Sequence, residues 1–177
     1  MPTQTRQIEV KVLEVNVDDL INKLTAMDAA IDFDGELMNV YFDNDAHQFT
    51  EGKDTLRLRK ARQITTLTFK KHISSEEAKV KDVWEVEVSD LEQMGEILEN
   101  LGYHVLHKSD KLRTAFNLGT VYFNIDSYPN IPSYIEVMAP DVNTINDSLR
   151  KLGIDPAKAV PWSIKEVFEH YGVNAPA

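Results

Sequence analysis

The stretch TLRLRKARQITTLTFK, residues 55–70, contains two short runs in which every second side chain is apolar. In the first run Leu56 and Leu58 alternate with Arg57 and Arg59. In the second run leucine and phenylalanine alternate with threonine and lysine. Because successive side chains of a strand point to opposite faces, each run predicts a β-strand with one apolar face and one polar or charged face.

The same alternation recurs along the chain, and its polar members are nearly all charged. Further runs lie at residues 7–12, 84–88, 111–113, 122–126 and 134–138. With residues 36–42 counted as a strand, the chain has about eight strands, which is the number at which a sheet can close around a small interior.

Four segments carry the start or stop signals of helices: residues 17–27, 91–101, 142–152 and 164–171. The predicted N-terminal caps are Asn16, the capping-box pair Ser89 and Glu92, and the capping-box pair Ser163 and Glu166. The predicted helix-ending glycines are Gly102, Gly153 and Gly172. The helical spacing of apolar residues gives the first three helices one apolar face each, which we expect to pack on the sheet.

Two arrangements fit the charged faces of the strands. One is an open antiparallel sheet with its apolar face on the helices and its charged face in water. The other is a closed barrel, whose charged face lines the lumen while helices cover the outside. The second is favoured because Arg-x-Arg, Glu-x-Glu and Lys-x-Arg pairs occupy the centres of the charged faces. We therefore predict one α+β domain, residues 1–177, built on a closed antiparallel β-barrel. Because unpaired buried charges are costly, its lumen should hold water, metal and an anion.

The composition argues against several classes of protein. The formal net charge of −10 repels polyphosphate backbones, so non-specific nucleic-acid binding is not expected. No run approaches the roughly 18 apolar residues of a membrane span, and no signal peptide is recognised, so we expect a cytosolic protein without a membrane partner. The chain has no cysteine, and its five histidines show no metal-ligand spacing.

A series of short motifs follows the order of the predicted strands. They are Val40-Tyr41-Phe42-Asp43, Leu56-Arg57-Leu58-Arg59, Leu67-Thr68-Phe69-Lys70, Glu85-Val86-Glu87, Lys111-Leu112-Arg113, Asn124-Ile125-Asp126 and Tyr134-Ile135-Glu136-Val137-Met138. The first strand, Gln7-Ile8-Glu9-Val10-Lys11, is similar to the pattern Glu-x-Glu-x-Lys. In order and spacing, over nearly its whole length, the chain resembles the CYTH family of triphosphate tunnel metalloenzymes. That family includes class IV adenylate cyclases, thiamine triphosphatases and inorganic triphosphatases.

The resemblance implies residues for each part of a reaction. The triphosphate would be held by the basic residues Lys11, Arg57, Arg59, Lys70, Lys111 and Arg113. The ions Mg²⁺ or Mn²⁺ would be held by Glu9, Asp126 and Glu136, with Glu85 and Glu87 as further candidates. In the thiamine triphosphatase branch a Tyr–Lys pair activates water, and Tyr41 and Lys70 occupy the matching positions. These residue types suit the task, because Arg and Lys bind phosphate oxygens and carboxylates bind hard cations.

Two positions depart from the family pattern, and both would weaken a metal site. Gln7 stands where the family has its first Glu, and Met138 stands where the last strand would carry a second Glu after Glu136. Either the register of the first strand is shifted by two residues, or two metal-site charges have been lost. We favour the loss, which would lower metal affinity while anion affinity persists.

Three functions follow. The first is a metal-dependent triphosphatase acting on inorganic triphosphate, thiamine triphosphate or a nucleoside triphosphate. The second is a class IV adenylate cyclase, which also needs an adenine pocket and an aligned ribose 3′-hydroxyl. The third is a non-catalytic binder of triphosphates or other polyanions. In each case the expected partner is a triphosphate-containing small molecule, and the protein would be a monomer or a homodimer.

Overall fold

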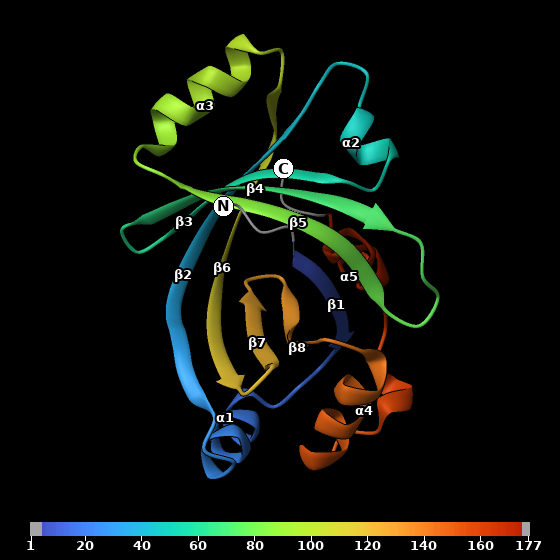
Figure 1. Ribbon diagram of the computed structural model, residues 1–177. Coiled ribbons are helices and arrows are strands. Elements are labelled where there is room, and N and C mark those ends of the chain that lie inside the picture. The colour runs from blue at the N-terminus through green and yellow to red at the C-terminus, as the bar shows by residue number, and fades with distance from the viewer. Residues whose placement is uncertain (1–4, 175–177) are drawn as a thin grey trace.

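In the computed structural model, which describes residues 5–174, the strands form one closed antiparallel β-barrel (Figure 1). The strands are β1 (Thr5–Val12), β2 (Ala30–Asp43), β3 (Thr55–Ala61), β4 (Ile64–Ile73), β5 (Lys79–Val88), β6 (His104–Leu118), β7 (Val121–Tyr128) and β8 (Ile131–Ala139). Their order around the barrel is β1-β5-β4-β3-β2-β6-β7-β8, and β1 closes the ring by pairing with β5 and with β8. The predicted closed barrel is therefore confirmed, and the open half-solvated sheet is wrong.

Two helices cover the outside of the barrel at the lower end of Figure 1, α1 (Val17–Ala26) and α4 (Val142–Lys151). Leu24 and Leu149, one from each helix, are fully buried in one apolar cluster with Phe123 of β7 and Val137 of β8. These two strand residues alternate with polar neighbours such as Asn124 and Glu136, so placing the apolar face under the helices turns the polar face into the lumen.

A second apolar cluster lies under α3 (Leu91–Asn100) and α2 (Gln48–Glu51). Leu98 of α3 packs there with Phe42 and Leu58 of the barrel. The short helix α2 lies between β2 and β3. It is held by the Asp43 carboxylate, which accepts hydrogen bonds from the backbone N–H groups of Phe49 at 3.0 Å and Thr50 at 2.8 Å.

The C-terminal segment contains the short helix η1 (Pro156–Lys158) and α5 (Ile164–His170). Val167 and Phe168 of α5 form a third apolar cluster with Tyr128 and Tyr134, two aromatic residues of β7 and β8. The rings of Tyr128 and Phe168 meet edge to face with centroids 5.2 Å apart. Helix α5 therefore packs on the barrel beside these two tyrosines.

Most of the predicted helix signals are confirmed. Asn16 caps α1, and Ser163 with Glu166 forms the capping box of α5. The glycines that follow α3, α4 and α5 have the positive φ that favours glycine after a helix. The capping pair Ser89 and Glu92 is wrong, because the aspartate one residue later caps α3 by accepting from the N–H of Gln93.

Three strands begin well before the runs that predicted them. β2 begins at Ala30 and β6 at His104, because the two strands pair with each other far beyond their motifs. β5 begins at Lys79 and pairs there with Glu9 of β1. Cross-strand pairing therefore extends strands through residues whose own alternation is weak. The extension of β5 adds lysines to the lumen face, among them Lys79, the register partner of Glu9.

Candidate functional site

The lumen is lined by the charged faces of the strands, as their alternation predicts. Its buried polar side chains include Glu9, Lys11, Arg57, Thr68, Asn124, Asp126 and Glu136, and none of these residues exposes more than 9% of its surface. Charges at this depth cost several kcal/mol each unless they are paired, so their partners decide what the lumen can bind.

One wall of the lumen, here called the ion-pair wall, begins with two carboxylates and two lysines around β1. Lys11 Nζ lies 2.9 Å from Glu136 Oε2 and 3.5 Å from Glu9 Oε1. Lys79 Nζ lies 2.8 Å from the same oxygen of Glu9. Burial and the neighbouring Glu136 raise the pKa of Glu9, but Lys79, Lys11 and Lys70 outweigh them and lower that pKa to about 2. Glu9 is therefore a carboxylate at any physiological pH.

The ion-pair wall continues on β6 and β7 around Asp126, whose side chain is completely buried. Arg113 donates from Nε to Asp126 Oδ1 at 2.6 Å and from Nη2 to Oδ2 at 2.7 Å. Lys111 Nζ donates to Oδ2 at 2.6 Å. Burial raises the pKa of Asp126. The neighbouring cations Arg113 and Lys111 lower this pKa by a larger amount, so it lies below its ordinary value. Both oxygens of this carboxylate are occupied by cations.

A second wall, on β3 and β4, carries Arg57, Arg59 and Lys70, here called the basic corner. Arg57 Nη2 donates to Thr68 Oγ1 at 3.2 Å and lies 3.9 Å from Glu85 Oε2, its nearest carboxylate oxygen among residues 5–174. Arg57 Nε is buried and has no hydrogen-bond partner in the described part of the chain. A buried donor without an acceptor is rare in folded proteins and indicates a missing ligand or water.

Within residues 5–174, the other two cations of the basic corner form hydrogen bonds to neutral side chains only. Arg59 Nε donates to Asn39 Oδ1 at 2.9 Å, and Lys70 Nζ donates to Gln7 Oε1 at 2.8 Å. Burial, followed by repulsion from Arg57, lowers the pKa of Arg59 to about 9 and the pKa of Lys70 to about 7. The basic corner therefore holds like charges that an anion would stabilise.

The comparison with protein families agrees with this geometry. The family model of the CYTH domain matches residues 5–162, which is most of the chain. This chain belongs to the CYTH family. The family includes triphosphatases and adenylate cyclases, and it depends in general on metal ions.

Solved structures show that the CYTH barrel of this chain has close structural relatives. The PH1012 protein of Pyrococcus horikoshii is 24% identical, with a TM-score of 0.76 over 90% of this chain and 98% of its own. A candidate adenylate cyclase of Vibrio parahaemolyticus is 18% identical, with a TM-score of 0.80 over 94% of this chain and 99% of its own. HpAC1 of Hippeastrum, whose dominant activity is that of a triphosphatase, is 16% identical, with a TM-score of 0.65 over 96% and 98%. At these identities the likeness establishes the fold alone.

Among curated proteins, no relative matches this CYTH chain. None of the helices in the described residues combines the length and the apolar character needed to cross a membrane.

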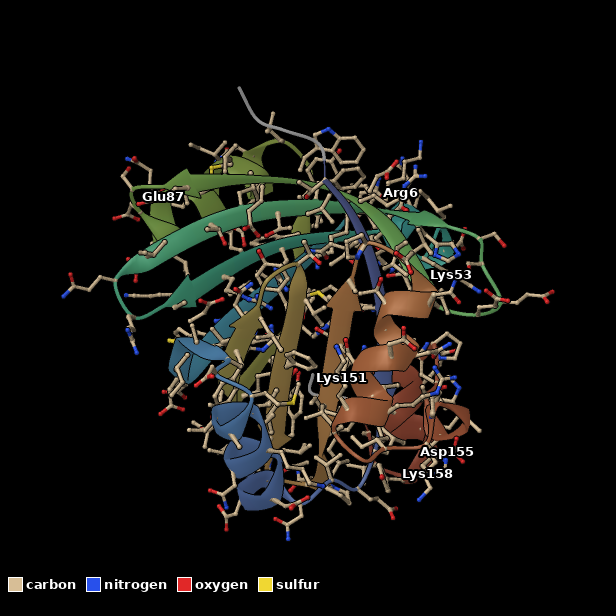
Figure 2. The ribbon with its side chains drawn as sticks, turned by 60° about the horizontal axis from the view of Figure 1, so that its bottom comes forward. Arg6, Lys53, Glu87, Lys151, Asp155 and Lys158 are labelled. Atoms are coloured by element: carbon tan, nitrogen blue, oxygen red, sulfur yellow. The ribbon has the colours of Figure 1, made fainter. Side chains whose placement is uncertain are left out.

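The CYTH barrel brings most of the predicted site residues together. The ion-pair wall contains Glu9, Lys11, Lys111, Arg113, Asp126 and Glu136, and the basic corner contains Arg57, Arg59 and Lys70. Two predicted metal ligands are exposed rather than buried with these groups, although Glu85 lies 3.9 Å from Arg57 of the basic corner. The Glu85 side chain is 48% exposed and accepts from Thr68 Oγ1, and Glu87 is exposed at the periphery of the molecule (Figure 2).

The predicted catalytic pair lies on separate strands. Tyr41 of β2 stacks on His107 of β6 with ring centroids 4.4 Å apart. Lys70 of β4 is bonded to Gln7 of β1, and β3 lies between β2 and β4. The role of Tyr41 and Lys70 in activating water stays a prediction.

Sequence reasoning missed three residues that contact the site. Lys79 was overlooked because β5 was predicted to start at Trp84, yet continuing the alternation backwards from Glu85 reaches Lys79 on the same face. Asn39 was overlooked because an amide on a charged face carries little signal. His107 was interpreted as an ordinary histidine, since the stack with Tyr41 depends on the pairing of β2 with β6.

The lumen carboxylates of this CYTH barrel do not fit a resident divalent cation. In residues 5–174 no group of three or more acidic, histidine or cysteine side chains could hold a metal ion. Both oxygens of Asp126 accept from basic groups, while Glu9 and Glu136 share Lys11. The side-chain oxygen of Gln7 accepts a hydrogen bond from Lys70. Both oxygens of Asp126, Glu9 Oε1 and Glu136 Oε2 are thus already bound to ammonium or guanidinium groups, with which a hard cation would have to compete.

Proposed function

We propose that this CYTH protein binds a triphosphate-containing small molecule in its lumen and hydrolyses one of its phosphoanhydride bonds. The observation that carries the proposal is the basic corner, with its buried Arg57 Nε and its two cations of lowered pKa. A phosphate group supplies the anionic oxygens that these donors lack, and Arg can bind two of them at once.

The full set that we propose for the triphosphate is Lys11, Arg57, Arg59, Lys70, Lys111 and Arg113. The three members in the ion-pair wall already have carboxylate partners. They would therefore attract the triphosphate mainly through long-range electrostatics rather than through direct bonds. The basic corner would make the direct bonds, because its donors exchange neutral partners or none for phosphate oxygens.

Hydrolysis would follow from the same charges. Water attacks a phosphorus atom, the bond from that atom to the bridging oxygen breaks, and the proton of the water leaves to a base or to solvent. Negative charge develops on the departing phosphate, where fixed cations stabilise it. Tyr41 and Lys70 are the groups proposed to activate the water. The ions implied are Mg²⁺ or Mn²⁺, and Glu9 and Glu136 are the lumen carboxylates nearest to forming a site for them.

One observation favours a second candidate, a non-catalytic binder of polyanions. Gln7 and Met138 lack the charges of the family pattern, and Met138 is the cross-strand partner of Glu9 in the β1–β8 register. The proposed single domain over residues 1–177, the cytosolic location and the monomeric or homodimeric state are consistent with either candidate.

The deciding experiment is calorimetric titration of the full chain with inorganic triphosphate, followed by two assays with and without Mg²⁺ or Mn²⁺. One assay measures phosphate release from inorganic triphosphate, thiamine triphosphate and ATP, and the other measures cyclic AMP from ATP. Arg59→Ala should lose binding, whereas the exposed control Arg150→Ala on α4 should not.

Each outcome of that experiment selects one function. Binding with phosphate release supports the triphosphatase, binding without turnover supports the binder, and cyclic AMP production would replace the hydrolase with the cyclase. No binding of any triphosphate would overturn the proposal.

A further inference from the structure

Lys79 is paired with Glu9, a carboxylate that a metal-dependent lumen would need free to bind the ion. It is the first residue of β5 and the register partner of Glu9 on β1. Its Nζ lies 2.8 Å from Glu9 Oε1, with side chains only 20% and 8% exposed. Glu9 Oε1 also lies 3.5 Å from Lys11 Nζ. A divalent ion that binds this oxygen would therefore compete with Lys79, its closer ammonium partner.

The departures at Gln7 and Met138 make that competition unfavourable for the ion. A carboxylate at either position would add negative charge beside Glu9, whose register partner on β8 is Met138. Instead, the Gln7 side chain is neutral and is bonded to Lys70, and Met138 offers only a thioether, which binds hard cations poorly. The pair Glu9 and Glu136 thus has no further carboxylate to help it outcompete two lysines.

The buried side chains of the lumen carry a net positive charge, which favours binding of an anion. The basic side chains are Lys11, Arg57, Arg59, Lys70, Lys79, Lys111 and Arg113, and the buried carboxylates are Glu9, Asp126 and Glu136. The cations outnumber the carboxylates. A divalent cation entering this lumen alone would meet net repulsion, whereas a polyanion meets net attraction.

We propose that Lys79 takes the place of a divalent cation in this barrel: its ammonium group neutralises Glu9, so that the lumen binds inorganic triphosphate without a metal ion. The inference rests on the proposed function, because it concerns how the same lumen accepts the triphosphate. Lys79 is a positioning residue in this role, acting on the anion through Glu9.

The test compares wild-type protein with Lys79→Gln, Lys79→Arg and the control Lys108→Gln, whose lysine is exposed on β6. Inorganic triphosphate is titrated calorimetrically in chelator and in Mg²⁺, and Mn²⁺ alone is titrated without triphosphate. Wild type and Lys108→Gln should bind triphosphate in chelator and show no Mn²⁺ site. Lys79→Gln should lose triphosphate affinity in chelator by about tenfold or more, since it removes a charge-assisted bond and exposes the Glu9 charge to the anion.

The same Lys79→Gln variant should gain Mn²⁺ affinity by about tenfold or more, because Glu9 is then free of one competing ammonium group. Lys79→Arg, which keeps the charge, should retain the wild-type pattern in both titrations. Thermal unfolding of every variant shows whether it is folded, and if Lys79→Gln does not fold, Lys79→Met provides the same loss of charge.

The outcomes separate this inference from the proposed function. Triphosphate binding by wild type only in Mg²⁺ would overturn the role of Lys79 and leave the proposed function standing. Unchanged Mn²⁺ and triphosphate affinities in Lys79→Gln would also overturn it. Absence of triphosphate binding in both buffers would overturn the proposed function and this inference together.

Discussion

Both walls of the lumen carry lysine and arginine side chains, but the walls differ in whether these cations have carboxylate partners. In the ion-pair wall, Asp126 accepts hydrogen bonds from Arg113 and Lys111 at 2.6–2.7 Å, and every cation of this wall has a carboxylate partner within the protein. In the basic corner, the hydrogen bonds that Arg59 and Lys70 donate in the described part of the chain go to amide oxygens. The first wall is complete without a ligand, and the second is not.

This difference teaches that burial of charge alone does not identify a binding site. A buried cation with a carboxylate partner serves the structure, because removing it leaves an uncompensated charge. A buried cation without one costs stability in the free protein and is compensated only by a ligand. The same substitution of arginine should therefore damage folding on one wall and binding on the other.

The largest effect is expected from Arg113→Ala in the ion-pair wall. This change leaves the fully buried Asp126 with Lys111 as its remaining close cation. The free energy of unfolding should fall by about 3–5 kcal/mol, the usual result of breaking a buried pair. Denaturant unfolding at neutral pH measures it. A loss below about 1 kcal/mol, as for an exposed pair, would show that the wall is hydrated rather than buried.

The matched change in the basic corner is Arg59→Ala. It should weaken inorganic triphosphate binding by about 1.5–3 kcal/mol, because charge-assisted bonds to phosphate are lost. The free energy of unfolding should hold or rise, since repulsion between Arg57 and Arg59 disappears. Calorimetric titration and denaturant unfolding of one preparation give both quantities. Equal affinity in variant and wild type would remove this arginine from the site.

A smaller effect should come from restoring the missing carboxylates with Gln7→Glu and Met138→Glu. Together they should tighten Mn²⁺ binding by about 1 kcal/mol more than the sum of the single changes. Without metal the added carboxylates repel each other and Glu9, so the coupling should vanish or become unfavourable in chelator. A double-mutant cycle measures this coupling by titration. Additive effects in metal would mean that the two positions do not share an ion.

The smallest expected effect is a pH dependence of stability and of triphosphate affinity. Lys70 in the basic corner and Lys111 in the ion-pair wall both contribute to it, because burial lowers the pKa of each to about 7. The pKa of Lys70 is lowered to about 7 in the folded protein from an ordinary 10.5, so the unfolded chain binds more protons between these values. Stability of the free protein should therefore rise with pH across this window. Bound triphosphate favours the ammonium form, so affinity should fall as the pH rises above about 7.

This pH effect is measured by titrating triphosphate at about pH 8 in buffers of different ionisation enthalpy, which reports proton uptake on binding. Lys70→Met should reduce that uptake. Equal proton uptake in wild type and Lys70→Met would mean that Lys70 is already charged before the anion arrives.

The sequence predicts which residues face the lumen, because alternation fixes the face of each strand. Arg57 and Arg59 are placed correctly from their own strand alone. The sequence does not predict which carboxylate, if any, pairs with each cation. Whether a cation is compensated depends on register between strands far apart in the chain, as in the pairing of Glu9 with Lys79. Alternation also says nothing of depth, so Glu87 was predicted in the lumen although it is exposed.

The closure of the ring at β1 has a consequence for the order of folding. Every other strand has at least one barrel neighbour that precedes or follows it directly along the chain, whereas β1 pairs with β5 and β8. Hairpins such as β3–β4 and β7–β8 need only short loops to close, while β1 must wait for distant segments at a larger entropic cost. We therefore expect β1 to join the barrel last during refolding. Until it does, Glu9 and Lys11 remain in water, and the charged interior is assembled only in the final step.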